Sequence, residues 1–298
     1  MSRHTTVLLI EAVEGLHLSP AATVIDATFG AGGHSRAILT KIKDGGTLIG
    51  IDADATALTD AHLEKTDATV HLVHNNFSHI REIAGSLEIN SVDGILADLG
   101  WRMEQFAGNG KGFSFMHDEP LIMTYGDGKE YSFTAADIVN DWDEHVLADI
   151  IFGYAEERFA RRIAKKIVEV RAKTPIETTF QLVEVVKAAL PAVAKRGKTN
   201  PATKTFQALR IAVNDELSVL ETFITDAFTL LAPGGRLAII TFHSIEDRIV
   251  KLRFKELASA ELGQLVTKKP IVPSEQELKE NPRARSAKLR IIEKLHTT

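Results

Sequence analysis

Apolar and polar positions alternate in blocks along the first hundred residues, in the rhythm of strands followed by helices. Apolar runs of strand length lie at 24–27, 48–52, 70–74 and 92–96. The segments between them carry the three-to-four-residue apolar spacing of helices. A strand–helix order repeated in this way predicts an α/β fold with a parallel, doubly wound sheet.

The rhythm stops after residue 103. Residues 104–131 are rich in glycine and lack periodicity, which is typical of a long loop beside a ligand. A strongly helical pattern then fills 134–191. One helix in it has an apolar stripe and, largely on its other face, a row of basic residues. The stripe consists of Phe159, Ile163, Ile167 and Val170.

The strand–helix rhythm resumes at residue 205. It predicts a long helix over 205–231, a strand over 237–242 and a helix over 246–257, with two short strands in the tail at 265–266 and 289–292. We therefore expect one discontinuous α/β domain, interrupted by an inserted loop and helical domain that recognises the substrate. The α/β domain comprises 1–103 and 205–298, and the insertion comprises 104–204.

Composition narrows the class of protein. The 298 residues are 44% hydrophobic and 25% charged, as in soluble globular proteins. No apolar run approaches the roughly 20 residues of a membrane helix, and the first residues lack a signal pattern, so we expect a cytoplasmic protein without a membrane partner. The absence of cysteine excludes thiolate metal sites and cysteine nucleophiles, and so argues against cytosine C5 methylation through a cysteine adduct. The net charge of −5 permits an enzyme with a local basic patch.

The stretch from Val24 to Ser35 predicts a cofactor-binding turn between a strand and a helix. Gly30, Gly32 and Gly33 allow a tight turn and a close approach of the backbone to a ligand. Asp52 ends the next strand, 20 residues after Gly32, near the spacing at which a carboxylate reaches ribose hydroxyls.

The third glycine of the dinucleotide fingerprint is replaced here by Ser35, which disfavours NAD(P) and an oxidoreductase. The turn suits S-adenosylmethionine, which has no pyrophosphate. The alternative is a tight turn that binds nothing.

Two further strand ends supply candidate site residues. Asp98 and Trp101 follow the fourth strand, where an exocyclic-amine methyltransferase places an acceptor for the amine and an aromatic ring for the base. The alternative is a buried carboxylate capping a turn, with Trp101 in the core. Phe77 follows the third strand and either lines an adenine pocket or belongs to the core.

Histidines and basic segments leave more than one interpretation open. His243 follows a strand and is a candidate for proton transfer, while Ser244 and Asp247 are expected to cap the next helix. His71 and His74 point to opposite faces of a strand, and we expect no metal site. Basic residues gather at 158–173, 195–204 and 283–290, as either solvated surfaces or RNA contacts.

Several long blocks carry a family resemblance over nearly the whole chain. They lie at 4–9, 26–35, 112–115, 156–160, 201–210, 242–248 and 281–286. Through these blocks the chain resembles the MraW family, the H-type methyltransferases of bacterial small-subunit ribosomal RNA. The resemblance implies a class I S-adenosylmethionine-dependent methyltransferase fold, Rossmann-like, with a helical insertion.

The resemblance also implies a reaction, its partner and its site. The reaction is N4 methylation of a cytosine in the decoding centre of 16S rRNA, in the small ribosomal subunit or its precursor. Whether the protein forms a homodimer is left open at this point. The implied cofactor contacts are Gly32, Gly33, His34, Asp52, Phe77, Asp98 and Gln105. Of these, Gln105 rests on the family alone.

Two stretches depart from the family pattern. The residues at 101–107 replace a serine pair and Pro-Gln-Leu-Asp, and those at 120–125 replace Pro-Leu-Asp-Met-Arg-Met. Both fall in the loop expected over the reacting base, and a carboxylate and an arginine are lost. Two alternatives follow: a cofactor-binding but catalytically silent ribosome assembly factor, and an N-methyltransferase with a shifted target base.

Overall fold

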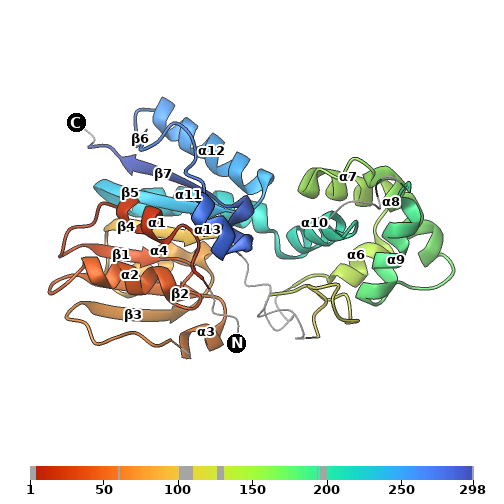
Figure 1. The fold of residues 1–298 in the computed structure, drawn as a ribbon, viewed down its shortest axis with the longest axis horizontal. Helices are drawn as coiled ribbons and strands as arrows, with labels where there is room; N and C mark the ends of the chain where they lie inside the picture. The colour runs from red at the N-terminus through yellow and green to blue at the C-terminus, as the bar shows by residue number, and fades with distance from the viewer. Residues whose placement is uncertain are drawn as a thin grey trace. The chain divides into compact units, whose positions relative to one another are not determined.

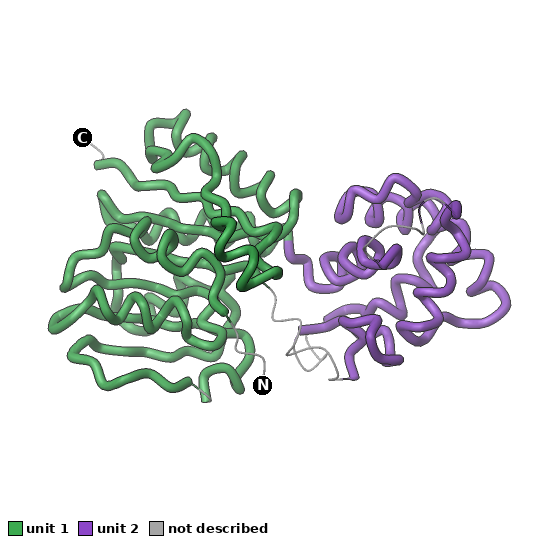
Figure 2. Tube along the Cα trace, in the orientation of Figure 1, with its two compact units in different colours: residues 1–100, 217–298 green, residues 101–216 purple. Residues whose placement is uncertain are grey.

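The computed structural model describes residues 5–59, 61–100, 110–125, 131–192, 194 and 200–296. The chain forms two compact units (Figure 2). Unit 1 contains residues 1–100 and 217–298, and unit 2 contains residues 101–216. Among the described helices, none combines the length and apolar content needed to cross a bilayer.

Unit 1 is built on a seven-stranded sheet with the order β3-β2-β1-β4-β5-β7-β6. β1 to β5 run parallel, as the sequence predicts, whereas β7 runs antiparallel to both β5 and β6. The strands are β1 (Thr23–Asp26), β2 (Thr47–Asp52), β3 (Thr69–His74), β4 (Val92–Asp98), β5 (Leu231–Thr241), β6 (Gly263–Leu265) and β7 (Lys288–Lys294). The doubly wound sheet is therefore confirmed, with one antiparallel strand near its edge.

Helices cover both faces of this sheet (Figure 1). Because successive side chains of a strand point to opposite faces, Val24 joins the core cluster with α1 and α2, while Ile25 joins the cluster with α4, α11 and α12. The helical elements of unit 1 are α1 (Leu9–Gly15), α2 (Gly33–Lys41), α3 (Ala55–Thr59), the 3₁₀ turn η1 (Phe77–His79), α4 (Ile80–Ser86), α11 (Glu216–Leu230), α12 (Ser244–Ser259), α13 (Glu275–Glu280) and the 3₁₀ turn η3 (Pro282–Ser286).

The described part of unit 2 is helical and has its own core. Its helices are α6 (Ala135–Asp141), α7 (Glu144–Ala155), α8 (Ala160–Arg171), α9 (Thr179–Ala189) and α10 (Thr203–Asn214). In α8 the predicted amphipathic pattern is confirmed, because Ile163 and Ile167 are fully buried while Arg161, Arg162 and Lys165 are exposed.

The long helix expected over 205–231 is two helices. Asp215 takes the left-handed conformation (φ 47°), so α10 ends at Asn214 and α11 begins at Glu216. Phe206 and Leu209 of α10 are buried in the core of unit 2. Unit 2 consequently extends to residue 216, whereas the sequence-based boundary stands at 204, because α10 buries its apolar face with the insertion.

Candidate active site

The glycine turn joins β1 to α2 at the carboxyl edge of the sheet. Gly32 precedes α2 with φ +72°, and a Cβ on it would lie 2.9 Å from the ring of Phe29. A Cβ on Gly33 would lie 1.8 Å from Oγ1 of Thr6. A side chain at either position would therefore force its neighbours to move, and the turn needs glycine at both.

Asp52 ends β2 and is bonded directly to this turn. Its Oδ2 accepts the Gly30 N–H at 2.7 Å, and its Oδ1 accepts the Asp54 N–H at 2.9 Å. The half-buried carboxylate is thereby held at the same edge of the sheet as the glycines. The structure brings together two features that the sequence paired only by spacing.

Asp98 ends β4, the strand beside β1. Its backbone N–H donates to Oγ1 of Thr28 at 2.6 Å, and its Oδ1 accepts the Gly100 N–H at 3.0 Å. Burial, together with the smaller effect of the negative charges of Asp26 and Glu246, raises the pKa of Asp98 to about 7 against the opposing Gly100 hydrogen bond. A carboxyl group that titrates near neutral pH is suited to taking up a proton.

His34 lies in the first turn of α2 and is buried. Its Nε2 lies 3.1 Å from the carbonyl oxygen of Val7, so Nε2 carries the proton of this hydrogen bond, since a carbonyl oxygen can only accept. Its Nδ1 lies 3.9 Å from Oδ2 of Asp98, too far for a direct hydrogen bond. His34 therefore lies beside Asp98 and ties α2 to the amino-terminal segment.

The sequence analysis did not single out Asp26, which the structure places at the end of β1, fully buried. Its Oδ2 accepts the Ser35 hydroxyl at 2.6 Å, and burial raises its pKa to about 6. Ser35 occupies the position of the missing third glycine, so its hydroxyl ties α2 to β1 where a glycine would allow only close packing. A carboxylate inside an apolar strand run was the available sequence signal.

Phe77 begins η1, half-buried, with its ring edge-on to Phe223 at 4.9 Å between centroids. It belongs to the border of the unit 1 core, and a place in the adenine pocket stays a prediction. Trp101 and Gln105 lie outside the described residues, as does the departing stretch 101–107.

The second departing stretch, 120–125, is well anchored in unit 2. Leu121 and Met123 are buried in its core, and the Met123 carbonyl accepts the Asn214 side-chain amide at 2.8 Å. The Tyr125 hydroxyl donates to Glu216, whose carboxylate also accepts Nε and Nη2 of Arg210 at 2.7 and 3.0 Å. The departure from the family pattern thus coincides with a local hydrogen-bonded network.

The capping predicted at the start of α12 was wrong by one residue. His243, not Ser244, is the N-cap: its Nδ1 accepts the Glu246 N–H at 3.3 Å, and the Glu246 carboxylate accepts the His243 N–H at 3.2 Å. Asp247 instead pairs with β7, through Lys288 at 3.0 Å and Arg290 at 2.7 Å. Because Lys288 and Arg290 are distant from Asp247 in sequence, the residues near Asp247 do not reveal that its carboxylate pairs with them instead of capping α12.

We expect Asp52→Asn to weaken S-adenosylmethionine binding by roughly tenfold or more, because the amide has one acceptor oxygen where the carboxylate has two and carries no charge. Isothermal titration with S-adenosylmethionine measures the effect. Asp54→Asn is the matched control two residues away, where Oδ1 accepts the Thr56 N–H at 2.9 Å and the Thr56 hydroxyl at 2.7 Å. Equal affinity of the Asp52 variant and wild type would contradict a cofactor role for Asp52.

Comparisons with known proteins place this site in context. The sequence profile described as the MraW methylase family matches residues 1–295. The chain is 45% identical to the ribosomal RNA small subunit methyltransferase H of Brevibacillus brevis, over 98% of both chains. It is 46% identical to the protein of the same name from Symbiobacterium thermophilum, over 98% of this chain and 96% of that one. A solved structure titled as an rRNA methylase from Streptococcus thermophilus is 11% identical, with a TM-score of 0.46, over 99% and 100% of the two chains.

Proposed function

Because this chain belongs to the MraW methylase family, we propose that it methylates N4 of a cytosine in the decoding centre of 16S ribosomal RNA. The observation that carries the proposal is Asp98, a half-buried carboxyl group with a pKa of about 7, beside the glycine turn at the carboxyl edge of β4. The name shared by the relatives, small subunit methyltransferase H, supports ribosomal RNA as the substrate.

The fold is that of a class I methyltransferase, Rossmann-like, with an antiparallel β7 and a helical insertion between β4 and β5. The cofactor is S-adenosylmethionine, which when bound supplies a methyl group activated by a positively charged sulfur. The donor set fits this molecule. Asp52 offers carboxylate oxygens for ribose hydroxyls, Gly32 and Gly33 allow close backbone approach, and Phe77 offers an apolar ring.

The chemistry proposed for Asp98 starts from the weakness of the nucleophile. The lone pair on N4 of cytosine is delocalised into the ring, so orientation and proton removal both matter. The Asp98 carboxylate and a neighbouring backbone carbonyl accept hydrogen bonds from the amine and hold it in one orientation. Asp98 then takes the amine proton, for which a pKa of about 7 is well matched near neutral pH.

The target base must leave its stack to reach this edge of the sheet. We assign the stacking role to the aromatic ring of Trp101, and a further cofactor contact to Gln105. Recognition of the surrounding RNA is assigned to the insertion, whose helix α8 exposes Arg161, Arg162 and Lys165.

A second candidate is a cofactor-binding but catalytically silent assembly factor. It is favoured by the changed residues at 120–125, where Ile122 and Thr124 replace the usual carboxylate and arginine. Tyr125, beside them, joins a network with Glu216 and Arg210. Both candidates require S-adenosylmethionine binding, and they differ in whether methyl transfer follows.

The test is transfer of labelled methyl from S-adenosylmethionine to small ribosomal subunits that lack this modification, followed by nucleoside analysis. We expect N4-methylcytidine at one decoding-centre position. No transfer, with the cofactor still bound in a parallel titration, would favour the silent factor. Label on another base would instead indicate a shifted target.

A further inference from the structure

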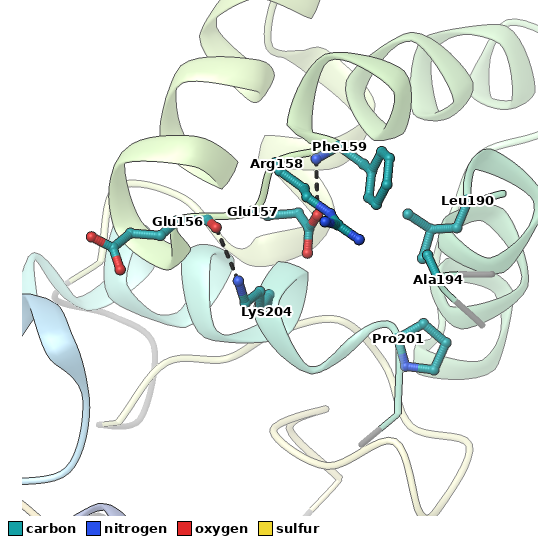
Figure 3. Close-up of a pocket in the computed structure, with 8 residues that line it drawn as sticks. All are labelled: Glu156, Glu157, Arg158, Phe159, Leu190, Ala194, Pro201 and Lys204. Atoms are coloured by element: carbon teal, nitrogen blue, oxygen red, sulfur yellow. Dashed lines mark hydrogen bonds between the residues drawn. The ribbon is translucent and has the colours of Figure 1, made fainter. Parts of the chain in front are cut away.

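Unit 2 contains a pocket where α7 leads into α8 (Figure 3). Its volume is about 370 Å³, within the range of roughly 300–1,000 Å³ found for small-molecule sites. Eight residues from three segments of unit 2 line it: Glu156, Glu157, Arg158, Phe159, Leu190, Ala194, Pro201 and Lys204. All eight belong to unit 2, and none of them is among the residues assigned to methyl transfer.

Half of the lining residues are apolar: Phe159, Leu190, Ala194 and Pro201. Phe159 is half-buried, and Figure 3 shows its ring turned toward Leu190, with Pro201 lower in the same pocket. The guanidinium of Arg158 lies 4.8 Å from the centroid of the Phe159 ring. In RNA-binding proteins, unpaired bases stack on aromatic rings and on the planar guanidinium groups of arginine.

The remaining lining groups are charged. Lys204 is exposed, and its Nζ donates to the Glu156 carbonyl at 2.9 Å, which fixes the ammonium at the rim. Glu157 is buried, with Oε1 accepting the Phe159 N–H at 2.9 Å. Two carboxylates, those of Glu156 and Glu157, belong to the lining, and a carboxylate is an acceptor for the amino group of a base.

A stripe of cations continues from the pocket along α8. Arg161, Arg162 and Lys165 follow Arg158 at helical spacing and are exposed. Within the part of the chain that the structure describes, these three form no ion pair, whereas Lys166 on the flank pairs with Glu169 at 3.2 Å. Exposed cations without acidic partners are suited to the phosphates of a nucleic-acid chain.

We propose that this pocket binds one unpaired nucleotide of the substrate RNA, other than the cytosine that is methylated. Its base stacks on Phe159, its phosphate contacts Lys204 and Arg158, and the following phosphates run along the α8 stripe. This inference rests on the proposed function, which makes small-subunit RNA the substrate. It deepens that proposal by naming the residues through which the insertion would hold the RNA.

The electrostatic test uses the full-length double variant Arg158→Gln, Lys204→Met and unmodified small-subunit rRNA as the probe. We expect RNA binding to weaken by about tenfold or more. The slope of log affinity against log salt should fall by about 1.4, or about 0.7 for each cation removed from the phosphate chain. In methyl transfer, KM for the RNA should rise while kcat changes little. Lys187→Gln is the control, because it removes an exposed lysine of unit 2 already paired with Glu184 at 2.8 Å.

The stacking test uses Phe159→Leu, which keeps apolar volume beside the unit 2 core, compared with wild type. We expect RNA affinity to fall by about fivefold or more, with the salt slope and the affinity for S-adenosylmethionine unchanged. Thermal unfolding of each variant reports whether the fold is retained. If the charge variant and Phe159→Leu, both folded, bind RNA as tightly as Lys187→Gln, the nucleotide pocket is overturned.

The same experiments separate this inference from the proposed function. A wild-type protein that methylates the rRNA, with pocket variants as active as the control, would overturn only the pocket. A wild-type protein that transfers no methyl group would contradict the proposed function, while loss of RNA binding in the pocket variants would still support the nucleotide site.

Discussion

Replacing Asp98 with asparagine is expected to lower the rate of methyl transfer by at least about a hundredfold, the usual contribution of a positioned proton acceptor. The amide oxygen still accepts the Gly100 N–H, and the Thr28 hydrogen bond involves only the backbone of residue 98. The local fold should therefore survive. The amide, however, takes up no proton and presents its own N–H groups to the substrate amine.

Single-turnover transfer of labelled methyl to unmodified small subunits measures this loss, with S-adenosylmethionine affinity determined in parallel. Asp93→Asn is a matched control on the same strand, because Asp93 is exposed and its Oδ2 accepts the Thr23 N–H, away from the strand's carboxyl end. A rate for Asp98→Asn close to that of Asp93→Asn would remove Asp98 from the mechanism.

The second large effect is on the pH dependence of stability. Burial raises the pKa of Asp98 from 3.8 to about 7, so between these values the folded protein holds a proton that the unfolded chain has lost. The stability this contributes is fully present below about pH 4 and is lost as the pH rises to about 7. The difference between the two pKa values corresponds to at most about 4 kcal/mol in the free energy of unfolding.

Asp98→Asn removes this titration, so its unfolding free energy relative to wild type should increase between about pH 4 and about pH 7. Calorimetric unfolding of both proteins at each pH, in matched salt, gives the difference. Asp26→Asn should show a smaller change in a lower window, since burial raises the pKa of Asp26 only to about 6. A difference between wild type and Asp98→Asn that is independent of pH would contradict the raised pKa.

Local sequence signals predicted where in the fold several of the candidate site residues lie. The turn at Gly32 was predictable because a φ of +72° lies in the left-handed region, which few residue types other than glycine adopt. The placement of Asp52 and Asp98 was predictable as well, because each ends an apolar run of strand length and parallel strands end at one edge of the sheet. Trp101 and Gln105 remain predictions of the sequence, outside the described residues.

Long-range contacts decided the features that sequence analysis missed or misplaced. In the sequence, Ser35 only interrupts the glycine pattern. The structure shows that its hydroxyl donates a hydrogen bond to Asp26. His243 displaces Ser244 as the cap of α12, while Asp247 is held by Lys288 and Arg290 of β7. For Asp247, the deciding partners lie too far along the chain for local spacing to reveal them.

The sequence by itself determined the strand–helix order, the glycine turn and the carboxylates at the strand ends, since each follows from local backbone preference and apolar periodicity. Only the tertiary structure decided the break at Asp215, the antiparallel direction of β7 and the extent of unit 2. It also decided the proton affinity of Asp98, because that depends on burial and on charges brought from other strands and helices. These properties depend on which segments pack together, and local sequence patterns do not show which segments do so.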